Sequence, residues 1–457
     1  MAENWQEIVE RLQRENAELR AERDALRLRV KQLEELVAHL QSRLAELEHA
    51  AHRPAAPFRR PENKKVPPEQ RKRPGREKGH PGAFRQAPHI DEEVEVPLAA
   101  CPHCQGAITD RVPLTQVIEE IPPCRPRVFR VITWRGTCAK CGEVRTHHPL
   151  QTSTAQGAAG THLGPRALSL GALLNKHLGL TMSKTCVVLD KLCGLKFSRG
   201  GLSQALDRVA RRVAGDYEQL IKELRGSPAV FADETSWWVG GPQWWLWTFT
   251  TPGATVYRVE PQRGSEIVFD TLGAHYGGML VSDCLATYDK PAFRKHKCIA
   301  HHAKAIAAAR DRPDTGDTEY LRAWRVFFLK VLIHWASRDK LEPAAYAQGC
   351  AHLQAERDQL LARDVTKPGE VAVRNRLAKQ REHLLGCLDE PAAEPTNNRA
   401  ERSLRPAVIA RKLSCGNKTP RGKHTWEILA SLAQTCHLRL DDFVTWLIPR
   451  LQLMPAG

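Results

Sequence analysis

Ala229-Val-Phe-Ala-Asp-Glu-Thr235 and Met279-Leu-Val-Ser-Asp283 are the two stretches that decide the fold. Each is a short apolar run that leads into an acid, which predicts a buried strand with a carboxylate near its end. The residues between them predict two further strands, a tight hairpin turn and one helix. The expected elements are strands over residues 228–236, 243–250, 254–259 and 278–282, a turn at Gly240-Gly241 and a helix over residues 264–272.

The order strand, strand, strand, helix, strand matches the first half of a ribonuclease-H-like domain, an α/β fold with a central mixed sheet. In that fold the first and fourth strands are neighbours, so Asp233 and Asp283 are expected side by side. A fifth strand is expected over residues 297–300, and a helical insertion follows it over about residues 303–390. Another helix then begins near Asn398 and carries Glu401.

Asp233, Asp283 and Glu401 are the candidate catalytic residues. Three carboxylates from separate elements can hold two divalent metal ions, and two such ions can drive in-line attack on a phosphodiester. Each acid also has a purely structural interpretation. Asp233 or Asp283 can end a strand at a polar turn, and Asn398 with Glu401 three residues later matches a helix capping box.

The chain has 457 residues, enough for two to four domains, a net charge of +16 and a pI of about 9.4. The basic excess favours a nucleic-acid partner, with an anionic membrane as the competing interpretation. No apolar run approaches the roughly 20 residues of a membrane-spanning helix, and the charged N-terminus has no secretory signal. Thirteen cysteines, several in spaced pairs, predict a reducing cytosol and a metal site rather than disulfides.

Residues 1–50 have the heptad pattern of a coiled coil. Leucine recurs every seventh residue from Leu12 to Leu47 at position d, and Asn16 falls at an a position, where a polar side chain fixes the register. The g and e residues that meet in a parallel dimer have opposite charges, as in Glu15 with Arg20. The segment therefore predicts a homodimer or higher oligomer, with a lone amphipathic helix as the alternative.

Residues 96–155 predict a zinc-binding domain. They contain Cys101-Pro-His-Cys104 and Cys138-Ala-Lys-Cys141, each of which resembles a zinc knuckle. Four thiolates favour a closed and therefore structural Zn²⁺ site. Residues 127–135, between the pairs, are expected as strands of a ribbon.

Two further segments are candidates for DNA contact. Residues 51–95 form a basic, proline-rich linker, which either follows a phosphate backbone or is a solvated spacer. Residues 160–225 predict short helices, either a helix-turn-helix-like arrangement or a plain helical bundle. The basic residues in question are Arg71, Lys72, Arg73 and Arg76 in the linker, and Arg208, Arg211 and Arg212 in the last helix.

Four groups of residues match a known family: Asp233-Glu234-Thr235 with the tryptophan-rich hairpin, Ser282-Asp283 followed by Tyr288, Cys298-Ile-Ala-His301, and the run from Asn397 to Pro406. On these residues the chain resembles a bacterial DDE transposase of the insertion sequence 66 family. The resemblance covers nearly the whole chain, including a catalytic domain over residues 227–437 and a C-terminal segment over residues 438–457. Ile299 and Ala303 depart from the family pattern without touching the three acids.

The resemblance implies a DNA transposase. Asp233, Asp283 and Glu401 would be the DDE triad that binds Mg²⁺ or Mn²⁺, and Cys298 and His301 would lie close to it. Arg402 and Arg405, on the helix of Glu401, are expected to contact phosphate. Transposon terminal repeats and target DNA would be the double-stranded substrates, in the bacterial cytoplasm at the nucleoid, with accessory proteins as further candidate partners. The alternatives are a dimeric zinc-containing DNA-binding regulator without catalysis and a ribonuclease-H-like DNA nuclease.

Overall fold

The computed structural model describes residues 15, 17, 20, 22–35, 88–153 and 162–453. Residues 22–35 are helical, and Leu26, Val30 and Leu33, which belong to the expected coiled-coil seam, have exposed side chains. Most of the expected coiled coil lies outside the described residues. The linker residues considered for DNA contact, Arg71, Lys72, Arg73 and Arg76, also lie outside the described residues. None of the described helices has both the length and the apolar character that a membrane crossing requires.

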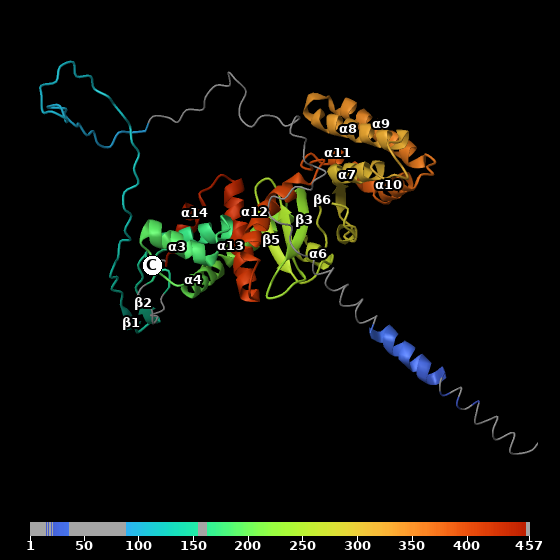
Figure 1. The fold of residues 1–457 in the computed structure, drawn as a ribbon, viewed down its shortest axis with the longest axis horizontal. Coiled ribbons are helices and arrows are strands. Elements are labelled where there is room, and N and C mark those ends of the chain that lie inside the picture. The colour runs from blue at the N-terminus through green and yellow to red at the C-terminus, as the bar shows by residue number, and fades with distance from the viewer. Residues whose placement is uncertain are drawn as a thin grey trace, which may run out of the picture. The chain divides into compact units, whose positions relative to one another are not determined.

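A five-stranded mixed sheet lies at the centre of the fold (Figure 1). Strand β3 pairs antiparallel with β4, and β4 with β5, whereas β3–β6 and β6–β7 are parallel pairs. The first and fourth strands of the expected order, β3 and β6, are therefore neighbours, as predicted, and the sheet is compatible with a ribonuclease-H-like core. In spatial order the strands are β5 (Thr255–Glu260), β4 (Trp244–Thr250), β3 (Ala229–Trp237), β6 (Met279–Ser282) and β7 (Arg294–Lys297).

The fifth strand begins three residues earlier than predicted, at Arg294 instead of Lys297, and the helix α7 (Ile299–Arg310) already follows at Ile299. The sequence Arg294-Lys-His-Lys297 looks like an exposed loop, but Lys297 is fully buried. Its amino group lies 2.9 Å from the Asp289 carboxylate and donates a 3.2 Å hydrogen bond to Ser282. These partners allow a basic sequence to form β7, an edge strand with mostly buried side chains, since a buried charge requires pairing.

Side chains alternate along the strands and divide the core between the two faces of the sheet. Val230 and Ala232 of β3 join one hydrophobic cluster, and Ala229 and Phe231 join another. The first cluster includes α2 (Pro165–Ala172), α4 (Arg199–Arg212), α5 (Ala214–Arg225), α6 (Glu266–Leu272), α13 (Pro420–Leu438) and α14 (Phe443–Leu451). The second includes α7, α8 (Glu319–Ala336), α9 (Pro343–Ala362), α10 (Pro368–Lys379) and α11 (Gly386–Asp389), so the chain between β7 and α12 (Asn398–Ser414) is helical, as expected.

The helices of residues 165–225 share their core with the sheet and have no separate core of their own. They also include the π-helix η3 (Leu173–His177) and α3 (Met182–Cys193). Ser198 caps the start of α4, where its hydroxyl accepts a 3.0 Å hydrogen bond from the Gly201 N–H. Arg211 pairs with Asp207 at 2.9 Å, and Arg212 donates to backbone carbonyls of the C-terminal segment. Two of the three arginines considered for DNA contact here therefore have intramolecular partners.

The helix α13 covers the free edge of β5. Outward-facing N–H groups on alternate residues of the strand donate to side-chain oxygens four residues apart on the helix. These spacings are roughly 6.6 Å on the strand and 6 Å on the helix, so the two rows stay in register over three contacts. The pairs are Thr255 with Thr435 (3.0 Å), Tyr257 with Ser431 (2.8 Å) and Val259 with Glu427 (2.5 Å).

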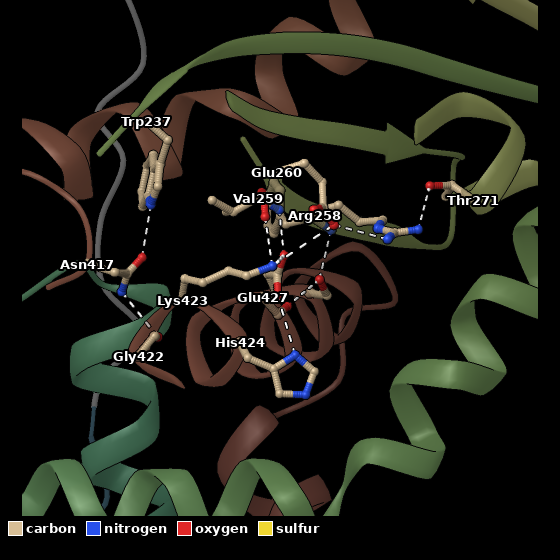
Figure 2. A network of polar contacts seen from close by, with 12 residues as sticks. Trp237, Arg258, Val259, Glu260, Thr271, Asn417, Gly422, Lys423, His424 and Glu427 are labelled. Carbon is tan, nitrogen blue, oxygen red and sulfur yellow. Dashed lines mark hydrogen bonds and ion pairs between the residues drawn. The ribbon is translucent and has the colours of Figure 1, made fainter. Parts of the chain in front are cut away.

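Figure 2 shows the Glu427 end of this contact. Lys423 donates to Glu427 at 3.1 Å and to the Val259 carbonyl at 2.7 Å, so the buried carboxylate has a cation as well as a backbone donor. The imidazole of His424 lies 3.4 Å from the other oxygen of Glu427, and this hydrogen bond raises the pKa of His424. The Glu427 end of the contact between α13 and β5 is therefore stabilised by an ion pair as well as by hydrogen bonds.

Candidate active site

Asp233 and Asp283 lie level with each other on neighbouring strands. Strands β3 and β6 pair in parallel, with Phe231 opposite Val281 as the last pair. Each acid lies two residues beyond that pair, so the same register brings the two acids side by side. Alternation along β3 also places Asp233 on the face of Phe231. Ala400 of α12 packs in the same cluster as Phe231, so this is the face that the helix of Glu401 approaches.

The carboxyl group of Asp233 is partly buried and lies among other acids. Burial, and then the charges of Glu234, Asp283 and Glu401, raise its pKa to about 7. The Glu234 N–H, 3.0 Å from Asp233 Oδ1, acts in the opposite direction. Asp283 and Glu401 both affect Asp233 electrostatically, so the structure brings the three predicted acids into one neighbourhood.

Asp283 also forms the polar turn that its structural interpretation predicted. Its Oδ1 atom accepts a 2.9 Å hydrogen bond from the Leu285 N–H, just after β6 ends. The Ser282 hydroxyl donates to the Asp283 carbonyl at 3.0 Å. This turn holds one carboxylate oxygen in place at the strand end, which fits a structural role and a catalytic one equally well.

Glu234 has a different environment from Asp233, although the two are adjacent. Its side chain is only 2% exposed, and it lies 2.6 Å from the Arg263 guanidinium and accepts a 2.6 Å hydrogen bond from the Tyr288 hydroxyl. Arg263 in turn lies over the ring of Trp245, 4.3 Å from its centroid. The charge of Glu234 is therefore neutralised on the opposite face of the sheet. The sequence analysis did not predict the ion pair between Glu234 and Arg263. The sequence indicated only that Glu234, next to Asp233 on a strand, would face the opposite side of the sheet.

Glu401 does not belong to a capping box. The predicted cap, Asn398, is exposed and is the first residue of α12, and Asn397 at the cap position forms no side-chain capping bond. Instead, the buried Asn397 amide donates a 2.8 Å hydrogen bond to the Ala232 carbonyl, next to Asp233 on β3. The capping interpretation was wrong because this contact with a distant strand moves the helix start by one residue. It leaves Glu401 without a capping role, 4.0 Å from His301 Nε2.

Cys298 and His301 lie at the start of α7, where they contact the start of α12 and Glu401. The buried Cys298 thiol accepts a 3.1 Å hydrogen bond from the Asn397 N–H, and the Cys298 N–H donates to the Ser282 carbonyl at 2.9 Å. Burial raises the pKa of this thiol. Cys298 therefore joins the end of β6 to the start of α12, and the two segments that it joins carry Asp283 and Glu401.

The three acids suit a hard divalent cation by their chemistry, because Mg²⁺ prefers carboxylate oxygens. The raised pKa of Asp233 agrees, since a bound cation would relieve the repulsion among these acids. As the described residues are arranged, no three His, Cys, Asp or Glu side chains are grouped to hold an ion. A shared ion therefore requires at least one side chain to rotate, and Glu401, with a side chain 48% exposed, has the space to do so.

Both cysteine pairs form tight turns of the kind that a zinc knuckle requires. In each, the first thiol accepts hydrogen bonds from backbone N–H groups of the following residues, which lowers the pKa of Cys101 and of Cys138. Such turns favour thiolates, the form that binds metal. Across the described ranges, however, Cys101, Cys104, Cys138 and Cys141 are not grouped as one metal site.

The ribbon strands lie at other residues than predicted. They are β1 (Arg135–Cys138) and β2 (Gly142–Arg145), which pair antiparallel around the second cysteine turn. Residues 127–134 have no regular structure, and Val128 and Ile132 are 83% and 71% exposed. An alternating pattern alone does not make a strand, because a strand also needs a partner and a surface to cover.

Arg402 and Arg405 are both exposed on α12, and neither has a hydrogen bond or ion pair within the part of the chain that the structure describes. Two other arginines of this helix are occupied. Arg399 pairs with Glu394 at 3.0 Å, and Arg411 donates to Thr235 at 3.0 Å. The two arginines predicted to contact phosphate are thus available to a ligand.

Comparison with known proteins identifies the family of this chain. The model of a family described as "Transposase IS66 family" matches residues 160–425, more than half of the chain. The chain is also similar to two proteins of Sinorhizobium fredii (strain NBRC 101917 / NGR234). Uncharacterized protein y4jD is 23% identical over 411 residues, 82% of this chain and 78% of that protein. Uncharacterized protein y4qI is 24% identical over 296 residues, 58% of this chain and 54% of that protein. The family match includes Asp233, Asp283 and Glu401, and the chain belongs to the IS66 family of transposases.

Proposed function

We propose that this protein is a DNA transposase that cuts DNA at transposon ends and joins those ends to target DNA, with Asp233, Asp283 and Glu401 as its DDE triad. The observation that carries the proposal is that three acids from separate elements share one neighbourhood, where burial and then the charges of Glu234, Asp283 and Glu401 raise the pKa of Asp233 to about 7. Perturbed carboxylates in such a cluster are typical of functional sites. Membership of a transposase family supports the same reaction class.

Asp233, Asp283 and Glu401 would hold Mg²⁺ or Mn²⁺, which when bound activates water or a 3′-hydroxyl for in-line attack and stabilises charge on the phosphate. The remaining residues position these acids. The Asn397 amide ties the start of α12 to β3, and Cys298 ties it to the end of β6. His301, 4.0 Å from Glu401, is placed to orient that carboxylate.

Arg402 and Arg405 would contact the DNA backbone, because a guanidinium donates two hydrogen bonds to phosphate oxygens. The net charge of +16 favours the same polyanionic substrate. A coiled coil over residues 1–50 would join two subunits, which suits a reaction on two transposon ends. A structural Zn²⁺ on Cys101, Cys104, Cys138 and Cys141 would order the region between the linker and the helices.

The test is cleavage and strand transfer on DNA that carries the terminal repeats, with Mg²⁺. Asp233→Asn, Asp283→Asn and Glu401→Gln are each expected to lower the rate by at least about 10²–10³-fold, because each removes a ligand charge worth several kcal/mol in the transition state. Asp311→Asn is the matched control, since Asp311 is an exposed acid at the end of α7. Its rate is expected to stay within about twofold of wild type.

The same assay separates the alternatives. Undiminished cleavage in one triad variant removes that residue from the triad. Cleavage without joined products would identify a nuclease, and DNA binding without either product would identify a regulator.

A further inference from the structure

A pocket beside Arg402 has the properties of a nucleotide-binding site. Its volume is about 320 Å³, at the lower end of the range of ligand pockets, about 300–1,000 Å³. Three elements line it: η3 through His177, α12 through Arg399, Arg402 and Pro406, and α13 through Gln434 and His437. The residues from α12 follow the spacing of one helix face, and Arg402 comes directly after Glu401 in the chain.

The lining of the pocket favours an anion. It includes two arginines and no acid. Arg399 already pairs with Glu394, so Arg402 is the charge available to a ligand. His177 and His437 lie with ring centroids 5.5 Å apart, and burial, together with His437, lowers the pKa of His177, so that imidazole adds a neutral polar surface. A phosphate group is therefore the charge that the pocket suits.

Gln434 is the second, independent sign of a ligand. Its side chain lines the pocket, the residue is only 6% exposed, and its Oε1 atom has no hydrogen-bond partner within the described residues. A buried amide oxygen without a donor is unfavourable, and native proteins satisfy nearly all such atoms. The Oε1 atom is enclosed, so the amide has to turn toward the pocket to accept a hydrogen bond from a ligand, and a phosphodiester group has no such donor.

A nucleotide supplies both groups, and its size suits the volume better than phosphate alone. Its phosphate would bind Arg402, and its base would lie against the apolar and ring surfaces of Pro406 and His437. Adenine, cytosine and guanine each carry an exocyclic amino group that donates hydrogen bonds, whereas thymine carries none. A base reaches such a pocket only when it has left the duplex or belongs to a single strand.

We propose that this pocket binds one unpaired nucleotide of the DNA substrate, through its phosphate on Arg402 and through an exocyclic amino group on Gln434 Oε1. The proposal rests on the proposed function for the identity of the substrate. Because Arg402 is adjacent to Glu401, the bound nucleotide would flank the phosphodiester that reacts. The pocket would thereby favour an amino-bearing base over thymine at one position of the DNA.

Binding by the full-length protein tests this without catalysis. Fluorescence anisotropy with labelled single-stranded oligonucleotides, in EDTA, compares adenine, cytosine and thymine at each position in turn. Arg402→Gln is expected to weaken binding of all of them about tenfold, while Lys412→Gln, which removes an exposed charge from the same helix outside the pocket, changes it less than about twofold. Equal losses in the two variants would overturn the assignment of the phosphate to Arg402.

Gln434→Met keeps the side-chain volume and is expected to abolish the preference for amino-bearing bases, about five- to tenfold in wild type. An unchanged preference in this variant would overturn the proposal. A second measurement needs no variant. Purine without the 6-amino group, placed at the preferred position, should bind to wild type as weakly as thymine, and binding equal to adenine would overturn the contact with Gln434.

Two further comparisons are needed. One distinguishes free nucleotide from DNA as the ligand of the pocket, and the other distinguishes failure of the pocket proposal from failure of the triad proposal. If free deoxyadenosine monophosphate competes as well as the oligonucleotide, the pocket is a mononucleotide site and the assignment to DNA is wrong. If Asp233→Asn loses cleavage but Gln434→Met keeps the base preference, only the pocket proposal is rejected. If Asp233→Asn keeps cleavage but Gln434→Met loses the base preference, only the triad assignment is rejected.

Discussion

Asp233 lies on β3 and Asp283 directly follows β6, the strand paired with β3, whereas Glu401 lies in the first turn of a helix. The separation of the strand acids is set by the pairing of β3 with β6. Glu401 depends on two side-chain contacts, from Asn397 and Cys298, and its own side chain is half exposed. One part of the site is thus fixed by backbone pairing, and the other is adjustable, which is useful where a metal ion and a bulky DNA substrate must enter.

The largest expected effect comes from changing the length of each acid. Asp233→Glu should lower the single-turnover cleavage rate by about 10²-fold or more, because a displacement of about 1 Å at a fixed position is enough to do so. Glu401→Asp should lower it by about tenfold or less, because the half-exposed side chain has room to adjust. If both variants lose activity equally, the helix acid is as rigidly held as the strand acids, and the contrast fails.

The next effect concerns the contact that holds α12 on the sheet. Asn397→Ala removes a buried hydrogen bond to the Ala232 carbonyl and should lower the free energy of unfolding by about 1–3 kcal/mol. Asn398→Ala is the matched control, because this neighbour is exposed, and its effect should be within about 0.5 kcal/mol. Urea denaturation measures both. A larger loss in Asn398→Ala would restore the capping box that the sequence predicted.

The smallest effect is a pH dependence of stability. The folded pKa of Asp233 is about 7, above the ordinary value of 3.8, so between these pH values the folded protein keeps a proton that the unfolded chain has released. The stability contributed by this group is therefore present below about pH 4 and is lost as the pH rises to about 7.

Asp233→Asn removes this dependence. In EDTA at pH 8 the variant should have a Tm about 2–4 °C above wild type, by differential scanning calorimetry, and the difference should disappear near pH 4. Mg²⁺ should reduce the difference at pH 8 by stabilising wild type alone. Parallel Tm curves for the two proteins at all pH values would show that Asp233 is not a strained acid.

The sequence was sufficient to predict the elements whose signals are local. The apolar runs at residues 229–232 and 279–282 gave β3 and β6, and their adjacency followed from the order of elements. The strand β7 was misplaced because Lys297 becomes a core residue only through Asp289. The cap at Asn398 was wrong because Asn397 binds a carbonyl 165 residues away, which no local pattern records.

The site divides in the same way. Asp233 and Asp283 were predicted from the apolar runs that precede them, whereas the choice of Glu401 depended most on the family resemblance. The Glu234–Arg263 ion pair and the pocket at Gln434 were invisible in the sequence, because each is assembled from distant segments by packing. Local pattern predicts an element and its face, and tertiary contacts decide which polar side chains have partners.

The helix α13, which covers the edge of β5, is synthesised much later than β5 itself. The N–H groups of Thr255 and Val259 find their acceptors in Thr435 and Glu427, 180 and 168 residues later in the chain. At about 5–20 residues per second, the ribosome needs roughly 10–35 s to make that span. During this interval the nascent protein has an open strand edge, the kind of surface through which chains aggregate. Only when residues 427–435 have left the ribosome can the sheet close, so a truncated product that ends before them would be prone to aggregate.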